Sequence, residues 1–245
     1  MRKNLVLCGF MGCGKTSIGK SLSTISSLPF VDIDEEIEKR MGMTISSIFM
    51  EKGEQYFRDL EEAMIKEFSR EEGIIIAVGG GALQRESNLQ SLKERGFLLC
   101  LLATPKVILR RLKGDETRPL LKGSEDKLEK IENLLRKRFP NYLKADAFLD
   151  TSFKSLRESL GYAKLLLDCL EKGVTPSNST PEGKWVISAL TERGEDLYSL
   201  LIEKEVSTKL TSAVRLYKKG YPLDFHKLRS RNLFLKWLKE EVLNS

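Results

Sequence analysis

The chain has 245 residues, which is long enough for one large domain or for one ordinary domain with an appendage. Hydrophobic residues make up 41% and charged residues 31%, a balance typical of a folded globular protein that excludes an intrinsically disordered chain. The net charge of +6 suits an enzyme with anionic substrates but does not by itself indicate nucleic-acid binding.

No apolar run reaches the roughly 20 residues that a membrane-spanning helix needs. The short apolar run near the N-terminus ends at once in a glycine-rich segment, so it is interpreted as a buried first strand rather than as a signal peptide. The chain is therefore expected to be cytoplasmic, with no membrane or nucleic-acid partner.

Five short apolar runs predict strands in chain order. Most are apolar at every position, which is typical of parallel strands covered on both faces. Charged segments with helical spacing lie between them, so we expect an α/β fold with a doubly wound, five-stranded parallel sheet and right-handed crossovers. The predicted strands are Leu5–Cys8, Phe30–Ile33, Ile74–Val78, Phe97–Leu102 and Ala147–Leu149, and the helical segments include Glu54–Ser69 and Lys127–Arg138.

This alternation stops near Gly173, so residues 1–173 are expected to form one domain. Residues 174–183 are rich in Pro, Ser, Thr and Gly and predict a linker. Residues 184–245 have apolar positions at helical spacing and predict an α-helical extension of unknown function, which could dock on the first domain or mediate oligomerisation. Its basic and aromatic residues could bind nucleic acid or an acidic partner, but a plain helical appendage is favoured.

The four cysteines show no spacing typical of a metal site and no CxxC pair. In a reducing compartment they are expected to be free thiols, most of them buried. They are Cys8, Cys13, Cys100 and Cys169.

The segment from Gly9 to Thr16 fits the P-loop pattern GxxxxGK[ST], directly after a predicted strand and before a predicted helix. Glycines let main-chain N–H groups surround a phosphate, and the following helix directs its positive N-terminus at the same anion. Lys15 is expected to neutralise charge between the β- and γ-phosphates, and the Thr16 hydroxyl is expected to contact Mg²⁺. The predicted ATP-binding residues of this segment are Gly12, Cys13, Gly14, Lys15, Thr16 and Ser17.

Asp32 and Asp34 come at the end of the second predicted strand, where period-two alternation would place both carboxylates on one side. One could hold Mg²⁺ while the other orients an acceptor hydroxyl. Because the third strand ends without an aspartate, Asp32 is the expected metal residue. The alternative is a pair of acids that cap the helix starting at Glu35.

Two further motifs predict a site for a small anion. Arg58 and Glu61 lie one helical turn apart, so the acid can hold the guanidinium for bidentate recognition of a carboxylate, although an ordinary surface ion pair has the same spacing. Residues 79–81 are three glycines after a strand, where the main chain can approach a ligand closely or simply turn.

Together these motifs resemble the shikimate kinase family over roughly residues 3–160. The P-loop, the two aspartates, the Phe57-Arg58-Asp59-Leu60-Glu61 segment and the three glycines occur in the family's order and spacing. So do Thr117–Leu121 and Lys137–Tyr142. The resemblance implies a P-loop kinase fold and ATP-dependent phosphorylation of shikimate to shikimate 3-phosphate, with ATP and shikimate as partners and Mg²⁺ as cofactor.

The resemblance also implies a role for each matching residue. Lys15, Asp34 and Arg118 would be catalytic, with Arg118 in a lid of about residues 112–124 that closes over the phosphates. Arg111 would stack on adenine, so Arg111 and Arg118 join the ATP-binding set, while Thr16 and Asp32 would be associated with Mg²⁺. The implied shikimate-binding residues are Asp34, Phe49, Phe57, Arg58, Gly79, Gly80, Gly81 and Arg138, with the two arginines on the carboxylate.

Two alternatives remain open from the sequence. Gluconate kinases and nucleoside monophosphate kinases share the P-loop and a lid, but they do not call for the whole motif set. The second alternative is a catalytically inactive nucleotide-binding module that acts through its C-terminal segment. The presence of Lys15, Asp32, Asp34 and Arg118 argues against this alternative.

Overall fold

The computed structural model describes residues 3–113, 126–142, 144–152 and 155–171. In this part of the chain, five parallel strands form one sheet in the order β2-β3-β1-β4-β5. The strands are β1 (Asn4–Gly9), β2 (Phe30–Asp32), β3 (Ile75–Ala77), β4 (Gly96–Leu102) and β5 (Ala147–Asp150). The central strand β1 is buried at every residue, because strands and helices cover it on all sides.

Helices connect successive strands. They are α1 (Lys15–Ser26), α2 (Ile33–Met41), α3 (Ile45–Phe68), α4 (Glu86–Arg95), α5 (Pro105–Arg111), α6 (Lys127–Tyr142) and α7 (Leu156–Glu171), with one 3₁₀ turn, η1 (Ala82–Gln84). Helix α3 is interrupted at Gly53, whose φ of 86° is not helical. Thr44 and Thr104 accept main-chain N–H groups at the starts of α3 and α5, which explains where these helices begin.

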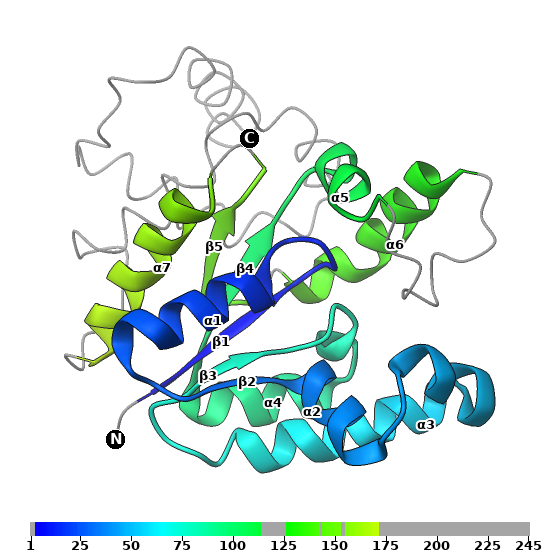
Figure 1. Cartoon of the computed structure of the whole chain (residues 1–245), viewed down its shortest axis with the longest axis horizontal. Helices are drawn as coiled ribbons and strands as arrows, with labels where there is room; N and C mark the ends of the chain where they lie inside the picture. The colour runs from blue at the N-terminus through cyan, green and yellow to red at the C-terminus, as the bar shows by residue number, and fades with distance from the viewer. Residues whose placement is uncertain (1–2, 114–125, 143, 153–154, 172–245) are drawn as a thin grey trace, which may run out of the picture.

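The sheet lies between two helical layers (Figure 1). Helices α1 and α7 pack side by side over one face of the sheet, while α3 and α4 pack together on the other. This placement follows from right-handed crossovers between parallel strands. The loops that leave the carboxyl ends of β1, β2 and β3 therefore emerge at one edge, which is where open α/β sheets bind ligands.

The predicted fold class is confirmed, and each predicted strand is present with ends shifted by a residue or so. The strand prediction for Ile33 is wrong, because Ile33 is the first residue of α2. Helix α6 also continues past Arg138 to Tyr142 despite Pro140. The expected free, buried thiols are confirmed for Cys8, Cys13 and Cys100, and the side chain of Cys169 lies outside the described set.

No helix within residues 3–113, 126–142, 144–152 and 155–171 is long and apolar enough to cross a membrane. The predicted linker at 174–183 and the predicted helical extension at 184–245 lie outside the described residues. The same holds for Arg118 and for most of the predicted lid.

The junction between β1 and the P-loop gives a stability prediction. Gly9 has a φ of +121°, and a Cβ there would clash with the main-chain carbonyl of Leu101 on β4. Gly42 also has a positive φ, of +63°, but a Cβ there meets nothing within 4 Å. We expect Gly42→Ala to lower the free energy of unfolding by about 1 kcal/mol through backbone strain alone. Gly9→Ala adds overpacking and should cost about 3 kcal/mol.

Urea denaturation of both variants measures this difference. Equal losses for Gly9→Ala and Gly42→Ala would show that the close approach of β4 does not constrain Gly9.

Candidate active site

The P-loop follows the central strand. The Lys15 ammonium donates to the main-chain carbonyls of Gly9 (2.9 Å) and Phe10 (3.0 Å), which holds the charge over the loop. Helix α1 begins at Lys15, so its first N–H groups face the same place as the lysine charge. The predicted ATP-binding residues Gly12, Cys13, Gly14, Lys15, Thr16 and Ser17 all lie in this loop or in the first turn of α1.

Two residues anchor the outer side of the P-loop. Arg111 donates to the carbonyl of Gly12 (3.0 Å) and to both the hydroxyl (3.0 Å) and the carbonyl (2.5 Å) of Thr151. The buried Thr151 hydroxyl also lies 3.1 Å from the carbonyl of Cys13. Arg111 is thus held beside the P-loop, and its contact with adenine stays a prediction. The contribution of Thr151 was not foreseen, because it depends on a contact across 138 residues.

Thr16 and Asp32 are brought together as predicted. The Thr16 hydroxyl donates to Oδ2 of Asp32 at 2.6 Å. A hydroxyl and a carboxylate oxygen are hard ligands that suit Mg²⁺, which is usually held by one or two protein oxygens together with phosphates. No cluster of three or more acidic, His or Cys side chains that could hold a metal by itself occurs in the described part of the chain.

Asp34 does not lie on a strand, which corrects the alternation argument. Strand β2 ends at Asp32, and Asp32 caps helix α2 by accepting the main-chain N–H of Asp34 at 3.1 Å. The helix-capping alternative is therefore right about Asp32. The two carboxylates therefore have different neighbours, Thr16 for Asp32 and Gly79 for Asp34.

The three glycines after β3 form the centre of the site. A Cβ on Gly79 would lie 2.5 Å from Oε1 of Glu61 and 2.8 Å from Oδ1 of Asp34, so both carboxylates are packed against this residue. The glycine position thus places Asp34 next to the buried acid of α3. No residue with a side chain fits there without moving one of the two acids.

The next two glycines contact the arginines. A Cβ on Gly80 would lie 3.2 Å from the main-chain nitrogen of Met11 and 3.4 Å from Nη1 of Arg138. A Cβ on Gly81 would lie 2.7 Å from Nη2 of Arg58. The turn therefore joins the P-loop, α3 and α6 at one point. The close approach of a ligand to its main chain stays a prediction.

Arg58 is held as the sequence predicts. Its Nη1 donates to Oε2 of Glu61 at 2.7 Å, and its Nη2 donates to Glu54 at 3.1 Å. Its guanidinium also lies over the Phe57 ring, 5.0 Å from the centroid. Phe49 packs against Phe57 with ring centroids 5.0 Å apart. The surface-pair alternative is wrong, because the Glu61 side chain is fully buried and that of Arg58 is 14% exposed.

The Arg58–Glu61 pair is electrostatically coupled. Burial raises the pKa of Glu61, and Arg58 is the main opposing influence, followed by Arg138 and Arg85. Burial also lowers the pKa of Arg58, but Glu61 and Glu54 outweigh it and hold that pKa above its usual value. Oε1 of Glu61 is buried without a hydrogen-bond partner among the described residues.

Arg138 provides a second buried cation. Its side chain comes from α6, and its guanidinium lies over the ring of Phe10, 5.5 Å from the centroid. The residue is 5% exposed, yet no carboxylate of the described chain forms an ion pair with it. A buried arginine without an acidic partner is well suited to bind an anion from outside the protein.

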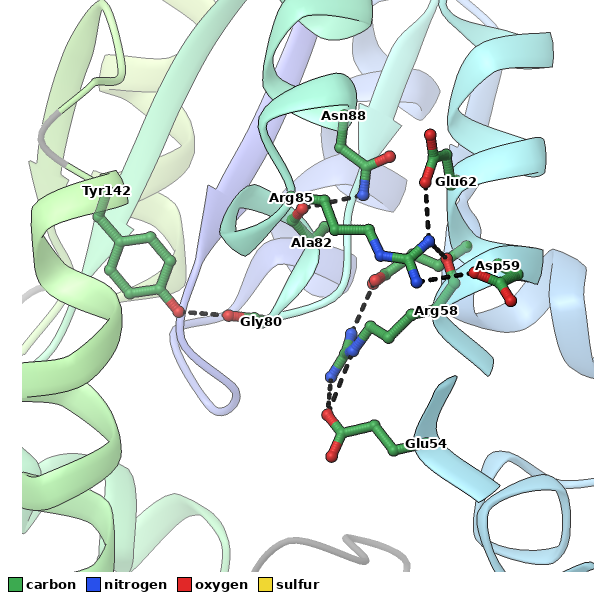
Figure 2. Close-up of polar contacts among 10 residues, drawn as sticks. Glu54, Arg58, Asp59, Glu62, Gly80, Ala82, Arg85, Asn88 and Tyr142 are labelled. Atoms are coloured by element: carbon green, nitrogen blue, oxygen red, sulfur yellow. Dashed lines mark hydrogen bonds and ion pairs between the residues drawn. The ribbon is translucent and has the colours of Figure 1, made fainter. Parts of the chain in front are cut away.

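Tyr142 and Asn88 support the glycine turn, as Figure 2 shows. The Tyr142 hydroxyl donates to the carbonyl of Gly80 at 2.5 Å, and Nδ2 of Asn88 donates to the carbonyl of Ala82 at 2.9 Å. Both side chains are buried. Tyr142 belongs to a motif that the sequence had singled out, whereas nothing in the sequence pointed to Asn88.

Comparison with known proteins agrees with this geometry. The family model described as shikimate kinase matches residues 11–166. The chain belongs to the shikimate kinase family. The match covers the P-loop from Met11 onward, the glycine turn and both arginine-bearing helices, so the family resemblance drawn from the motifs is confirmed.

Individual members of the shikimate kinase family align well with this chain. A shikimate kinase of Thermodesulfovibrio yellowstonii is 50% identical over 149 residues, which are 61% of this chain and 86% of that protein. One of Thioalkalivibrio sulfidiphilus is 39% identical over 184 residues, 74% of this chain and 96% of that protein. The solved structure of the Acinetobacter baumannii shikimate kinase in complex with shikimate superposes with a TM-score of 0.65 and 34% identity, covering 69% of this chain and 94% of that one.

The buried pair gives a second prediction. We expect Glu61→Gln to lower the free energy of unfolding by about 3 kcal/mol, because it leaves Arg58 buried without its main counter-charge. Glu54→Gln removes the other partner of Arg58, but the Glu54 side chain is 53% exposed. That control should cost about 0.5 kcal/mol or less. Urea denaturation of the two variants tests this, and equal costs would mean that losing Glu61 leaves no uncompensated buried charge on Arg58.

Tyr142 gives a third prediction. Burial raises the pKa of Tyr142. The folded chain therefore keeps the phenol proton at pH values where the unfolded chain has released it, so stability should fall as pH rises above about 10. Tyr142→Phe removes this proton and should flatten the alkaline decline, while costing about 1 kcal/mol at neutral pH for the lost hydrogen bond.

Thermal unfolding between neutral pH and pH 11 measures both effects. Tyr56→Phe, at a residue 39% exposed, serves as the control and should keep the wild-type decline because it leaves Tyr142 in place. An equally steep decline in Tyr142→Phe and in the wild type would contradict the prediction.

Proposed function

We propose that this chain transfers the γ-phosphate of ATP to a hydroxyl of shikimate, giving shikimate 3-phosphate and ADP. The observation that carries the proposal is the glycine turn, where the P-loop, Asp34, Arg58 and Arg138 meet. Among the small-molecule kinases that share a P-loop, membership of the shikimate kinase family favours shikimate over gluconate or a nucleoside monophosphate.

The two arginines account for a carboxylated substrate. Arg58 is fixed by Glu61 and Glu54, and Arg138 is buried without an acidic partner in the described chain. A carboxylate between them would complete the charge balance through charge-assisted hydrogen bonds. The ring of Phe57 lies beside Arg58 and packs against the ring of Phe49, and both rings would cover the apolar part of the substrate ring.

The transfer step uses positioning and charge neutralisation more than covalent chemistry. Asp34 holds the acceptor hydroxyl of shikimate. The hydroxyl oxygen attacks the γ-phosphorus while the bond between this phosphorus and ADP breaks. The Asp34 carboxylate accepts the hydroxyl proton late in the step. Lys15 neutralises charge between the β- and γ-phosphates, and Arg111 covers the adenine side. Arg118 and most of the lid lie outside the described residues, and their closure over the phosphates, which excludes water, stays a prediction.

Mg²⁺ fits the oxygen donors at the start of α1. Thr16 and Asp32 would hold it, directly or through water, beside the phosphates. When bound, Mg²⁺ supplies positive charge that offsets charge on the phosphate oxygens. The Thr16–Asp32 hydrogen bond keeps both oxygens together for this purpose.

We also propose the chain organisation that the sequence predicts. Residues 1–173 form the kinase domain, and the match to the family model, which ends at residue 166, supports this limit. The linker at 174–183 and the helical extension at 184–245 stay predictions. Cytoplasmic location likewise stays a prediction.

ADP release measured with ATP and Mg²⁺ tests the function, with shikimate compared against gluconate and nucleoside monophosphates. Of the acceptors compared, we expect only shikimate to support ADP release. Asp34→Asn should lower kcat about 10³-fold, since this variant removes the carboxylate that accepts the hydroxyl proton. Arg157→Met, an exposed change on α7, should keep wild-type turnover. ATP binding without any shikimate-dependent ADP release would refute the proposal and favour a nucleotide-binding module.

A further inference from the structure

Two adjacent residues, Gln84 and Arg85, contact the main chain of both anion-binding arginines. Nε2 of Gln84 lies 3.5 Å from the carbonyl of Arg138, and Nη1 of Arg85 donates to the carbonyl of Arg58 at 3.1 Å. The 3₁₀ turn η1 follows directly on the glycine turn; Gln84 is its last residue, and Arg85 comes next. A single short segment therefore links α3 to α6 at the two positions from which the arginines extend.

The contact with α3 is made by the whole guanidinium of Arg85. Besides the Arg58 carbonyl, Arg85 donates to Glu62 (2.7 Å) and Asp59 (2.7 Å), as Figure 2 shows. Each ion pair by itself would contribute little, because the side chains of Asp59 and Glu62 are 59% and 38% exposed. Three acceptors on one helix nevertheless fix the plane and position of the guanidinium.

The contact with α6 is shared among several side chains. Nδ2 of Asn141 donates to Oε1 of Gln84 at 3.2 Å, which holds the amide that faces the Arg138 carbonyl. The Tyr142 hydroxyl reaches Gly80, and Lys144 pairs with Glu86 at 2.8 Å. The last turn of α6 is thus tied to the segment that also holds α3.

The close contacts at the turn leave the arginines little freedom. The guanidinium of Arg58 lies 2.7 to 2.9 Å from the position of a Cβ on Gly81, and Nη1 of Arg138 lies 3.4 Å from that on Gly80. A shift of either helix relative to the turn would change the distance between the two guanidinium groups. Binding one carboxylate with two arginines is sensitive to such shifts, because misplacement by about 1 Å can cost about 100-fold in rate.

We propose that Gln84 and Arg85 form a brace that sets the separation between Arg58 and Arg138 and so positions them for the substrate carboxylate. This inference rests on the proposed function and adds to it two positioning residues that do not themselves touch the substrate. We expect the brace to affect the binding of shikimate and not that of ATP, because Arg111 and Thr151 hold the P-loop through the carbonyls of Gly12 and Cys13.

The chain offers a matched control for Arg85. Arg95, at the other end of α4, donates to the carbonyl of Arg70 (3.1 Å) and lies 3.4 Å from Glu72. It therefore makes the same kinds of contact, from one end of α4 to the segment after α3, but far from the glycine turn. Loss of Arg95 reports what such a contact contributes to stability alone.

The experiment compares Arg85→Met, Arg85→Lys, Gln84→Met and Arg95→Met in the full chain, with KM for shikimate, KM for ATP, kcat and thermal unfolding measured for each. We expect Arg85→Met to raise KM for shikimate about tenfold, with KM for ATP changed by less than about twofold. Arg85→Lys should recover part of the loss, since it can still donate to the Arg58 carbonyl. Gln84→Met should change KM for shikimate in the same direction, and Arg95→Met should change neither KM.

A double-mutant cycle separates positioning from general stabilisation. In an Arg58→Met background, Arg85→Met should raise KM for shikimate by less than about twofold, because the side chain that it positions is gone. The brace would be refuted if Arg85→Met raised KM for shikimate by the same factor in the wild-type and Arg58→Met backgrounds. It would also be refuted if Arg85→Met and Arg95→Met, each made in the wild-type chain, raised that KM equally. Neither result would contradict the proposed function, provided that the wild-type chain is active. A wild-type chain without shikimate-dependent ADP release would overturn the proposed function and the brace with it.

Discussion

The absence of side chains at residues 79–81 is the constraint on which the rest of the site depends. The carboxylates of Asp34 and Glu61 occupy the space beside Gly79, and the guanidinium groups of Arg138 and Arg58 lie beside Gly80 and Gly81. These groups come from α2, α3 and α6, so the turn brings three separate helices to one place. A Cβ at Gly79 or Gly81 would force a charged group away from the others, and in a close-packed interior that displacement would pass to its helix.

Of the two arginines at the turn, Arg58 forms an ion pair with a buried acid, and Arg138 forms none within the described chain. Glu61 is fully buried against Arg58, an arrangement that contributes little net stability because both ions lose water. Its effect is orientation, since a bidentate contact with a carboxylate needs a fixed guanidinium plane. Arg138 is buried without a matching acid in the described chain, and its charge is left for an anion from outside. One arginine is thus fixed by the protein, and under the proposed function the other would gain its counter-charge from the substrate carboxylate.

The sequence predicts the sheet well because its strands are buried on both faces, which makes them apolar at every position, as in Ile75–Ala77. It fails at Ile33 and Asp34, where a spacing of two suits either a strand or a capped helix start, and the structure shows the capped helix start. Motif spacing identified Asp34, Arg58 and Arg138, which meet at the glycine turn, and their contacts with ligands stay predictions. It missed Arg85, Gln84 and Thr151, because their partners lie 27, 54 and 138 residues away and no local pattern marks such contacts.

Both halves of the site use the same device, in which a polar side chain binds the main-chain carbonyl of a functional segment. Arg111 binds the carbonyl of Gly12 on the nucleotide side, and Arg85 binds that of Arg58 on the acceptor side. Such contacts fix the backbone and leave the functional side chain available for a ligand. This suits phosphoryl transfer, where the protein contributes position and electrostatics and little covalent chemistry. Because Arg111 and Arg85 share no contact residue, a change at one of them can alter the nucleotide side or the acceptor side alone. The glycine turn contacts both sides and so fixes their relative position.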